Sequence, residues 1–192
     1  DFNSALNFIF GISFYQGRKD SLSDKFYGLA MDFVYSKDIG NIKPVLNFRN
    51  SKDKKEKIEK HNNTILKELK SLGINKEADR IMVLDIIGTA NFISERYGLN
   101  IVDYIVQEIQ NENLLNISRF LEEIYSIGPK ISGLILRDIV HIYDLTSCIN
   151  GLEDYSLLQP IDTWVHQVSL RIDIIQNDKI SKSEAKAITK YC

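Results

Sequence analysis

The sequence contains few of the residues that build cross-links and metal centres. Only two cysteines, Cys148 and Cys192, occur in 192 residues, so neither a disulfide framework nor a four-cysteine zinc or iron–sulfur site can form within this chain alone. The three histidines fall on different predicted helices without the spacing of metal ligands; they are His61, His141 and His166. We therefore expect a reducing compartment and no metal site.

Long apolar runs and an excess of one charge are also missing. No run approaches the length that spans a bilayer, and the first residues lack the basic start and apolar core of a signal peptide. We expect a protein that is not secreted and has no membrane partner. The 24 basic and 26 acidic residues leave a net charge of −2, which argues against a purely electrostatic nucleic-acid coat but allows a local phosphate site.

Apolar residues make up 44% of the chain, enough to bury a core, and they recur at helical spacing along most of it. Because neither an alternating strand nor an internal repeat is found, the sequence predicts an all-α protein. A mixed block of lysine, glutamate and aspartate opens residues 51–72, and we interpret it as a solvated helical face. The predicted helices cover residues 4–15, from 21 to the region of 40–44, 51–72, 75–97, 101–110, 114–125, from 129 and from 160, with 146–159 irregular.

A tight turn, Ser-Ile-Gly-Pro at residues 126–129, separates two of these helices. Gly128 can take a positive φ without steric cost, and the φ of Pro129 is preset for the first position of a helix. Lys130 is then the first charged residue after the turn. Alone, this pattern is typical of an ordinary pair of helices that pack through their apolar faces.

A second polar residue of interest, Asp162, precedes the apolar-periodic run that follows Pro160. An aspartate in this position most often caps a helix, because its carboxylate accepts hydrogen bonds from the first free amides. Neither Asp162 nor the turn indicates a function by itself.

Together, the two patterns resemble the helix-hairpin-helix glycosylase superfamily of DNA base-excision repair. In that superfamily a leucine-rich helix, a glycine turn and a lysine near the start of the second helix are followed by a Val-Asp-Thr-His or Pro-Val-Asp sequence. The matching segments here are residues 124–130, 134–138 and 160–163. Further upstream, residues 12–16 and 21–25 resemble the superfamily's glutamine loop, and residues 73–80 resemble its lead-in to the next helix.

The resemblance implies a DNA glycosylase that is also a lyase at abasic sites. Lys130 would attack the anomeric carbon and form a Schiff base, and Asp162 would stabilise the developing positive charge and handle the proton. Gln16 would fill the gap left by the extruded base. Backbone amides at Gly128 and the following helix start would hold a DNA phosphate, with Ser126 and Pro129 in the same turn.

Four features depart from the commonest members of the superfamily. Ser126 stands where the hairpin usually has its first glycine, and Trp164 replaces the histidine that commonly follows Asp-Thr. Lys130 and Asp162 are 32 residues apart, which is similar to an archaeal group of 8-oxoguanine glycosylases and favours an oxidised purine such as 8-oxoguanine. The cysteines of the iron–sulfur branch are missing, so no cluster is expected, although a monovalent cation could bind at the hairpin. Aromatic residues could stack on the flipped base or belong to the core; they are Phe14, Tyr15 and Trp164.

The resemblance further implies one glycosylase module over residues 1–192. A helical-barrel lobe of roughly 16–145 and a second lobe from 1–15 and 146–192 would enclose an active-site cleft. We expect a monomer that acts on double-stranded DNA with a damaged base, in the cytoplasm with the nucleoid or in a nucleus. Two alternatives stay open: a non-catalytic helix-hairpin-helix module that binds DNA or acts as a scaffold, and a monofunctional glycosylase that uses Asp162 alone.

Overall fold

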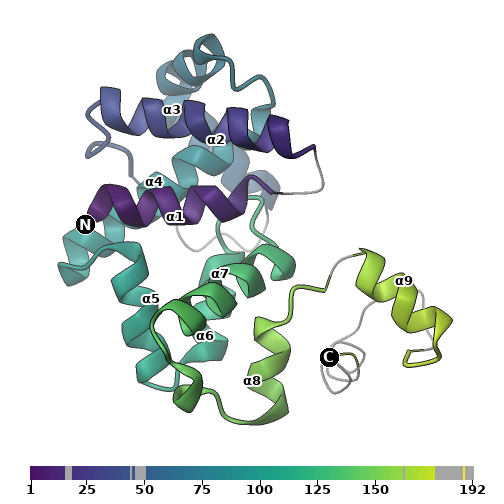
Figure 1. Ribbon diagram of the computed structural model, residues 1–192. Helices are drawn as coiled ribbons and strands as arrows, with labels where there is room; N and C mark the ends of the chain where they lie inside the picture. The colour runs from purple at the N-terminus through teal and green to yellow at the C-terminus, as the bar shows by residue number, and fades with distance from the viewer. Residues whose placement is uncertain (16–18, 44, 46–50, 162, 176–187, 189–192) are drawn as a thin grey trace. The chain divides into compact units, whose positions relative to one another are not determined.

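The computed structural model describes residues 1–15, 19–43, 45, 51–161, 163–175 and 188. Within these residues every regular element is helical and no strand occurs, which confirms the all-α prediction (Figure 1). No described helix is both long enough and apolar enough to cross a membrane. The elements are α1 (Phe2–Ser13), α2 (Asp20–Ser36), α3 (Ser51–Leu72), α4 (Glu77–Tyr97), α5 (Ile101–Gln110), α6 (Leu114–Glu122), α7 (Pro129–Ile142), the 3-10 turn η1 (Thr146–Cys148), α8 (Gly151–Leu158) and α9 (Thr163–Arg171).

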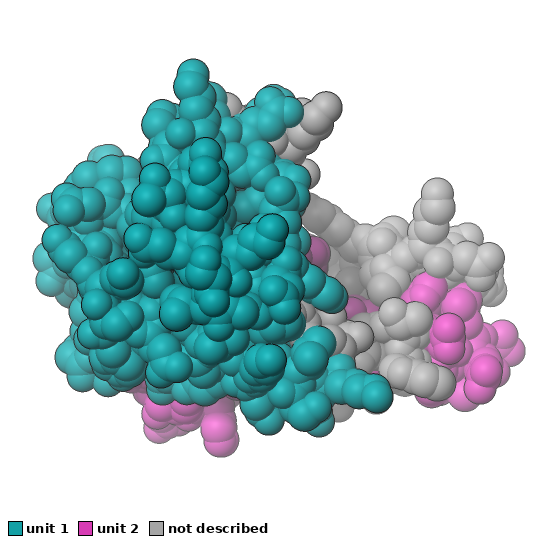
Figure 2. Space-filling view, turned by 90° about the horizontal axis from the view of Figure 1, so that it is seen from above, with its two compact units in different colours: residues 1–104, 120–127 teal, residues 105–119, 128–192 magenta. Residues whose placement is uncertain are grey.

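The chain divides into two compact units, drawn in teal and magenta in Figure 2. Unit 1 contains Asp1–Tyr104 and Phe120–Ile127, so it holds α1 to α4, the start of α5 and the end of α6. Unit 2 contains Ile105–Arg119 and Gly128–Cys192, which include α7, α8 and α9. The lobes implied by the family resemblance stay a prediction.

Unit 1 is built around α4. This helix buries every residue from Ile81 to Asn91, as expected for a helix that is apolar on nearly all sides. It packs against α3 and α1, and α1 packs against α2. Gly98 ends α4 in the left-handed conformation with φ 69°, and its N–H satisfies the Ser94 carbonyl at little conformational cost.

Unit 2 is organised around the packing of α7 on α8. The contact is close at Gly133, where an added Cβ would lie 3.1 Å from the backbone oxygen of Leu157. On α7, the Ser132 hydroxyl is buried and donates to the backbone oxygen of Ser118 on α6, at 3.3 Å. The prediction that residues 146–159 are irregular is wrong, because η1 and α8 lie there. Packing against α7 stabilises a helix in a segment whose own sequence signals a loop.

Candidate functional site

The α6–α7 turn (residues 123–128) is the part of the predicted site that the structure describes in full. Helix α6 ends at Glu122, three residues before the predicted end, and α7 begins at Pro129 as predicted. Ile124 and Ile127 are 2% and 3% exposed, and the Ile127 N–H donates to the Ile124 carbonyl at 3.0 Å. Two buried isoleucines therefore anchor a turn whose intervening Ser126 is exposed.

The left-handed residue of the turn is Ser126, with φ 64°, and Gly128 does not use the positive φ that its residue type allows. Gly128 has φ −100° and ψ −179°, an extended backbone that any residue adopts. A Cβ added to Gly128 would meet no atom within 4 Å. Among the described residues, neither backbone conformation nor packing requires glycine at position 128, and a Cβ there would point into open space.

The N-terminus of α7 has an unusual charge pattern for a helix start. Pro129 occupies the first turn, no side chain of Gly128 can cap the helix, and the first turn contains no acidic residue. The first amides of a helix lack partners within the helix and carry partial positive charge, which favours anions and disfavours cations. Lys130 nevertheless lies in this turn. The start of α7 therefore carries a lysine and no acidic residue of its own.

Lys130 is partly buried. Its neighbours Ile131 and Ile135 are 4% and 0% exposed, so they belong to the buried apolar face of α7. This anchoring limits the side-chain positions that Lys130 can take. A lysine on a rigid helix start is a better-placed nucleophile than one on a mobile loop.

Two other predicted site residues lie outside the residues that the structure describes. They are Gln16 and Asp162, so the predicted pairing of Lys130 with Asp162 stays a prediction. Trp164 belongs to α9, directly after its first residue. The structure thus brings together Ser126, Gly128, Pro129 and Lys130 in one turn and helix start.

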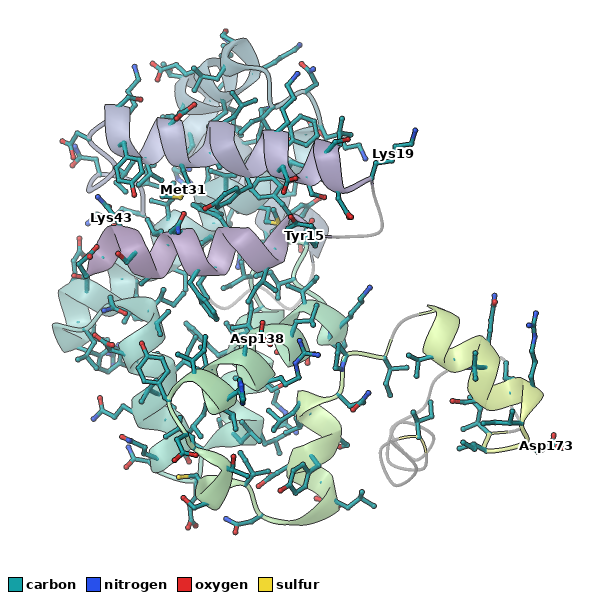
Figure 3. All side chains as sticks on the ribbon, in the orientation of Figure 1. Tyr15, Lys19, Met31, Lys43, Asp138 and Asp173 are labelled. Atoms are coloured by element: carbon teal, nitrogen blue, oxygen red, sulfur yellow. The ribbon has the colours of Figure 1, made fainter. Side chains whose placement is uncertain are left out.

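The aromatic residues before the glutamine loop differ in burial. Phe14 is 0% exposed, whereas Tyr15 is 41% exposed. Tyr15, which follows the end of α1, is labelled in Figure 3. The Tyr15 hydroxyl donates to Asp24 Oδ1 at 2.5 Å. This bond to the carboxylate raises the pKa of Tyr15 above its ordinary value. Phe14 is therefore a core residue, and only Tyr15 presents its ring at the surface.

Sequence interpretation missed a buried ion pair beneath the turn. Lys54 on α3 and Asp85 on α4 are 3% and 2% exposed, and Lys54 Nζ lies 2.6 Å from Asp85 Oδ2. The interpretation of the lysine-rich block as a solvated face is therefore wrong at Lys54. A signal was present in the sequence, since Asp85 interrupts the apolar run of α4, where a charge needs a partner.

Both members of the pair also contact the turn backbone. Lys54 Nζ donates to the Glu123 carbonyl at 2.6 Å, and Asp85 Oδ2 accepts from the Tyr125 N–H at 2.7 Å. The other carboxylate oxygen, Oδ1, is buried and has no hydrogen-bond partner in the described structure. Burial raises the pKa of Asp85 above its ordinary value, while Lys54 and the Tyr125 amide oppose that rise.

The described residues contain no group of three or more histidine, cysteine, aspartate or glutamate side chains arranged to hold a metal ion. Comparisons with known protein families, curated protein sequences and solved structures find no match for this chain. A functional assignment must therefore come from the chemistry of the turn and the helix start.

Proposed function

We propose that this protein is a DNA glycosylase with associated lyase activity, acting on an oxidised purine such as 8-oxoguanine in double-stranded DNA. The observation that carries the proposal is the start of α7, where Lys130 follows an uncapped, open Gly128–Pro129 pair. In this proposal Lys130 is the nucleophile, and the backbone amides within one helical turn of it bind an anion. In DNA, the sugar would be the target of Lys130, and the neighbouring phosphate would bind the backbone amides.

The phosphate contact would be made by backbone amides. Helix N-termini bind phosphate because their free N–H groups and the helix dipole point at the ligand. The open space at Gly128 supports this contact, since a phosphate can approach the backbone without meeting a side chain. Such contacts fix register and carry no sequence information, as a search for damaged bases requires.

The chemical step would be carried by Lys130. Its neutral amine attacks the anomeric carbon of the flipped nucleotide and the bond to the base breaks; the departing base takes up the proton that Asp162 receives from the attacking amine. Asp162 would accept the proton from the lysine and stabilise the cationic character at the sugar. Collapse to a Schiff base opens the sugar. Loss of a C2′ proton then expels the 3′ phosphate by β-elimination, and water releases the lysine.

Borohydride trapping tests this function. The protein is incubated with duplexes that contain 8-oxoguanine or an abasic site, and reduction by borohydride converts a Schiff base into a stable adduct. We expect an adduct with the wild type and none with Lys130→Gln. The matched control is Lys76→Gln, because Lys76 is an exposed lysine that directly precedes a helix, α4. Its adduct yield should equal that of the wild type.

The alternatives give different results in the same assay. A monofunctional glycosylase that uses Asp162 alone releases the base from both the wild type and Lys130→Gln reactions, without an adduct or strand cleavage. A non-catalytic module binds the duplex but releases no base. Undiminished trapping by Lys130→Gln would overturn the assignment of the nucleophile.

A further inference from the structure

Lys54 and Asp85 form a buried ion pair that the proposed chemistry does not use. Both residues lie in unit 1, and each makes a second bond to the α6–α7 turn, to Glu123 O and to Tyr125 N respectively. The turn segment after α6 is therefore held on both a carbonyl and an amide by side chains from two other helices. The Glu123 carbonyl and the Tyr125 N–H thus have side-chain partners in place of the backbone partners that a helix or a sheet would supply.

Stability alone does not account for a charge pair at this place. Moving two ions out of water is costly, and apolar residues of similar volume often replace a buried pair without loss of stability. An apolar pair, however, would leave the Glu123 carbonyl and the Tyr125 amide without these partners. The ion pair therefore contributes to the conformation of the turn, because it holds two of its backbone groups in place. Lys54 Nζ lies 2.6 Å from Glu123 O, and Asp85 Oδ2 lies 2.7 Å from Tyr125 N.

The residue after Tyr125 shows why the turn needs such fixing. Ser126 has φ 64°, a backbone conformation that is unfavourable for residues other than glycine. Sparsely populated backbone conformations persist only where the surrounding structure over-determines them. Asp85 holds the amide of Tyr125 directly before Ser126, so the pair opposes relaxation of the turn. Only three residues then separate Ser126 from Lys130.

We propose that Lys54 and Asp85 are positioning residues, which hold the α6–α7 turn in the conformation that presents the Gly128 amide and Lys130 to DNA. The inference rests on the proposed function, because it assigns the pair a part in delivering that nucleophile. Neither residue contacts DNA in this account, and neither transfers a proton.

The first test compares activity with stability in an apolar double variant, Lys54→Met/Asp85→Leu. We expect it to fold with a lower urea unfolding midpoint than the wild type, because the Glu123 carbonyl and the Tyr125 amide lose their partners; cleavage is therefore measured where both proteins are fully folded. Its single-turnover cleavage of an abasic-site duplex at saturating protein should fall by about tenfold to a hundredfold, the typical effect of a small misplacement of a reacting group. The control removes an exposed ion pair of the same unit, Lys37–Glu68 at 3.4 Å. Lys37→Gln/Glu68→Gln should cleave at the wild-type rate.

A conservative variant separates positioning from a merely structural role. In Lys54→Met/Asp85→Asn the asparagine oxygen can still accept the Tyr125 N–H, so most of the lost cleavage rate should return. Hydrogen exchange of the Tyr125 amide, followed by NMR, gives a second readout. That amide should exchange slowly in the wild type and in the asparagine variant, and rapidly in the leucine variant.

The outcomes separate this inference from the proposed function. A wild type that neither cleaves nor is trapped on abasic DNA overturns the proposed function, and the exchange of the Tyr125 amide then decides alone whether the pair holds the turn. An active wild type with an equally active Lys54→Met/Asp85→Leu variant overturns the positioning role. If the leucine variant does not fold, rapid exchange of the wild-type Tyr125 amide still refutes the inference.

Discussion

Replacing Ser126 by glycine should stabilise the folded chain. Ser126 is exposed and has φ 64°, so its Cβ lies close to the following carbonyl oxygen, a contact that glycine lacks. The cost of this conformation is about 1–2 kcal/mol for a residue with a side chain. Glycine loses more backbone entropy on folding, which costs about 0.5–1 kcal/mol. The expected net gain therefore lies between about 0 and 1.5 kcal/mol.

The matched control for this substitution is Ser126→Ala. Alanine removes the hydroxyl but keeps the Cβ, so it measures what the hydroxyl contributes at unchanged backbone cost. We expect the glycine variant to exceed the alanine variant by about 1 kcal/mol in free energy of unfolding. In a chain of this size that difference corresponds to a melting temperature higher by about 2–4 °C.

Urea and thermal unfolding of the three proteins, followed by far-UV circular dichroism, measures the effect. The slope of the unfolding free energy against urea should be the same in all three, because the exposed residue changes little buried area. If the glycine variant is no more stable than the alanine variant, Ser126 does not carry the conformational cost assigned to it. The reasoning about how the turn is held would then fail with it.

Two further predictions concern packing and charge. Gly28→Ala in α2 should stabilise the chain by about 0.5–1 kcal/mol in urea unfolding, because a Cβ there meets no atom within 4 Å. Gly133→Val should destabilise the chain by about 1–3 kcal/mol, because a Cβ there already lies 3.1 Å from Leu157 O. Equal effects of the two substitutions on stability would contradict the close α7–α8 contact. Because burial raises the pKa of Asp85, the folded chain holds this proton to higher pH than the unfolded chain does. The stability that Asp85 contributes is then fully present below its ordinary pKa of about 4 and is lost as the pH rises through the raised pKa. The stability of the wild type relative to Asp85→Asn should therefore fall with rising pH in that window, and a rise would contradict the assigned shift.

Much of the fold follows from local periodicity. The boundaries of α3 and α5 match the predicted residues 51–72 and 101–110, and α7 starts at Pro129 as predicted. These helices could be predicted from the sequence because helical spacing, a preset proline φ and glycine stops act within a few residues of each other. Helix α8 could not be predicted in this way, since its Asn-Gly start resembles a turn and its helix depends on contact with α7.

The candidate site was predicted less completely, for a related reason. The position of Lys130 after the turn could be read from the sequence, but the residue types did not predict that Ser126, rather than Gly128, takes the left-handed conformation. Tertiary contacts decide this, since Asp85 and Lys54 hold the turn from distant helices. A charged residue such as Lys54 looks solvated in its own segment, and only its distant partner explains its burial.

The most direct test of the central claim is to locate the trapped adduct on the chain. After borohydride reduction with an abasic-site duplex, nuclease and trypsin digestion would leave a nucleotide remnant on the modified lysine. Trypsin does not cut after a modified lysine, so an adduct at Lys130 yields the peptide of residues 120–137 with the remnant attached, identified by mass spectrometry. The account predicts this peptide. A remnant on any other lysine or on the terminal amine, or no remnant at all, would contradict it.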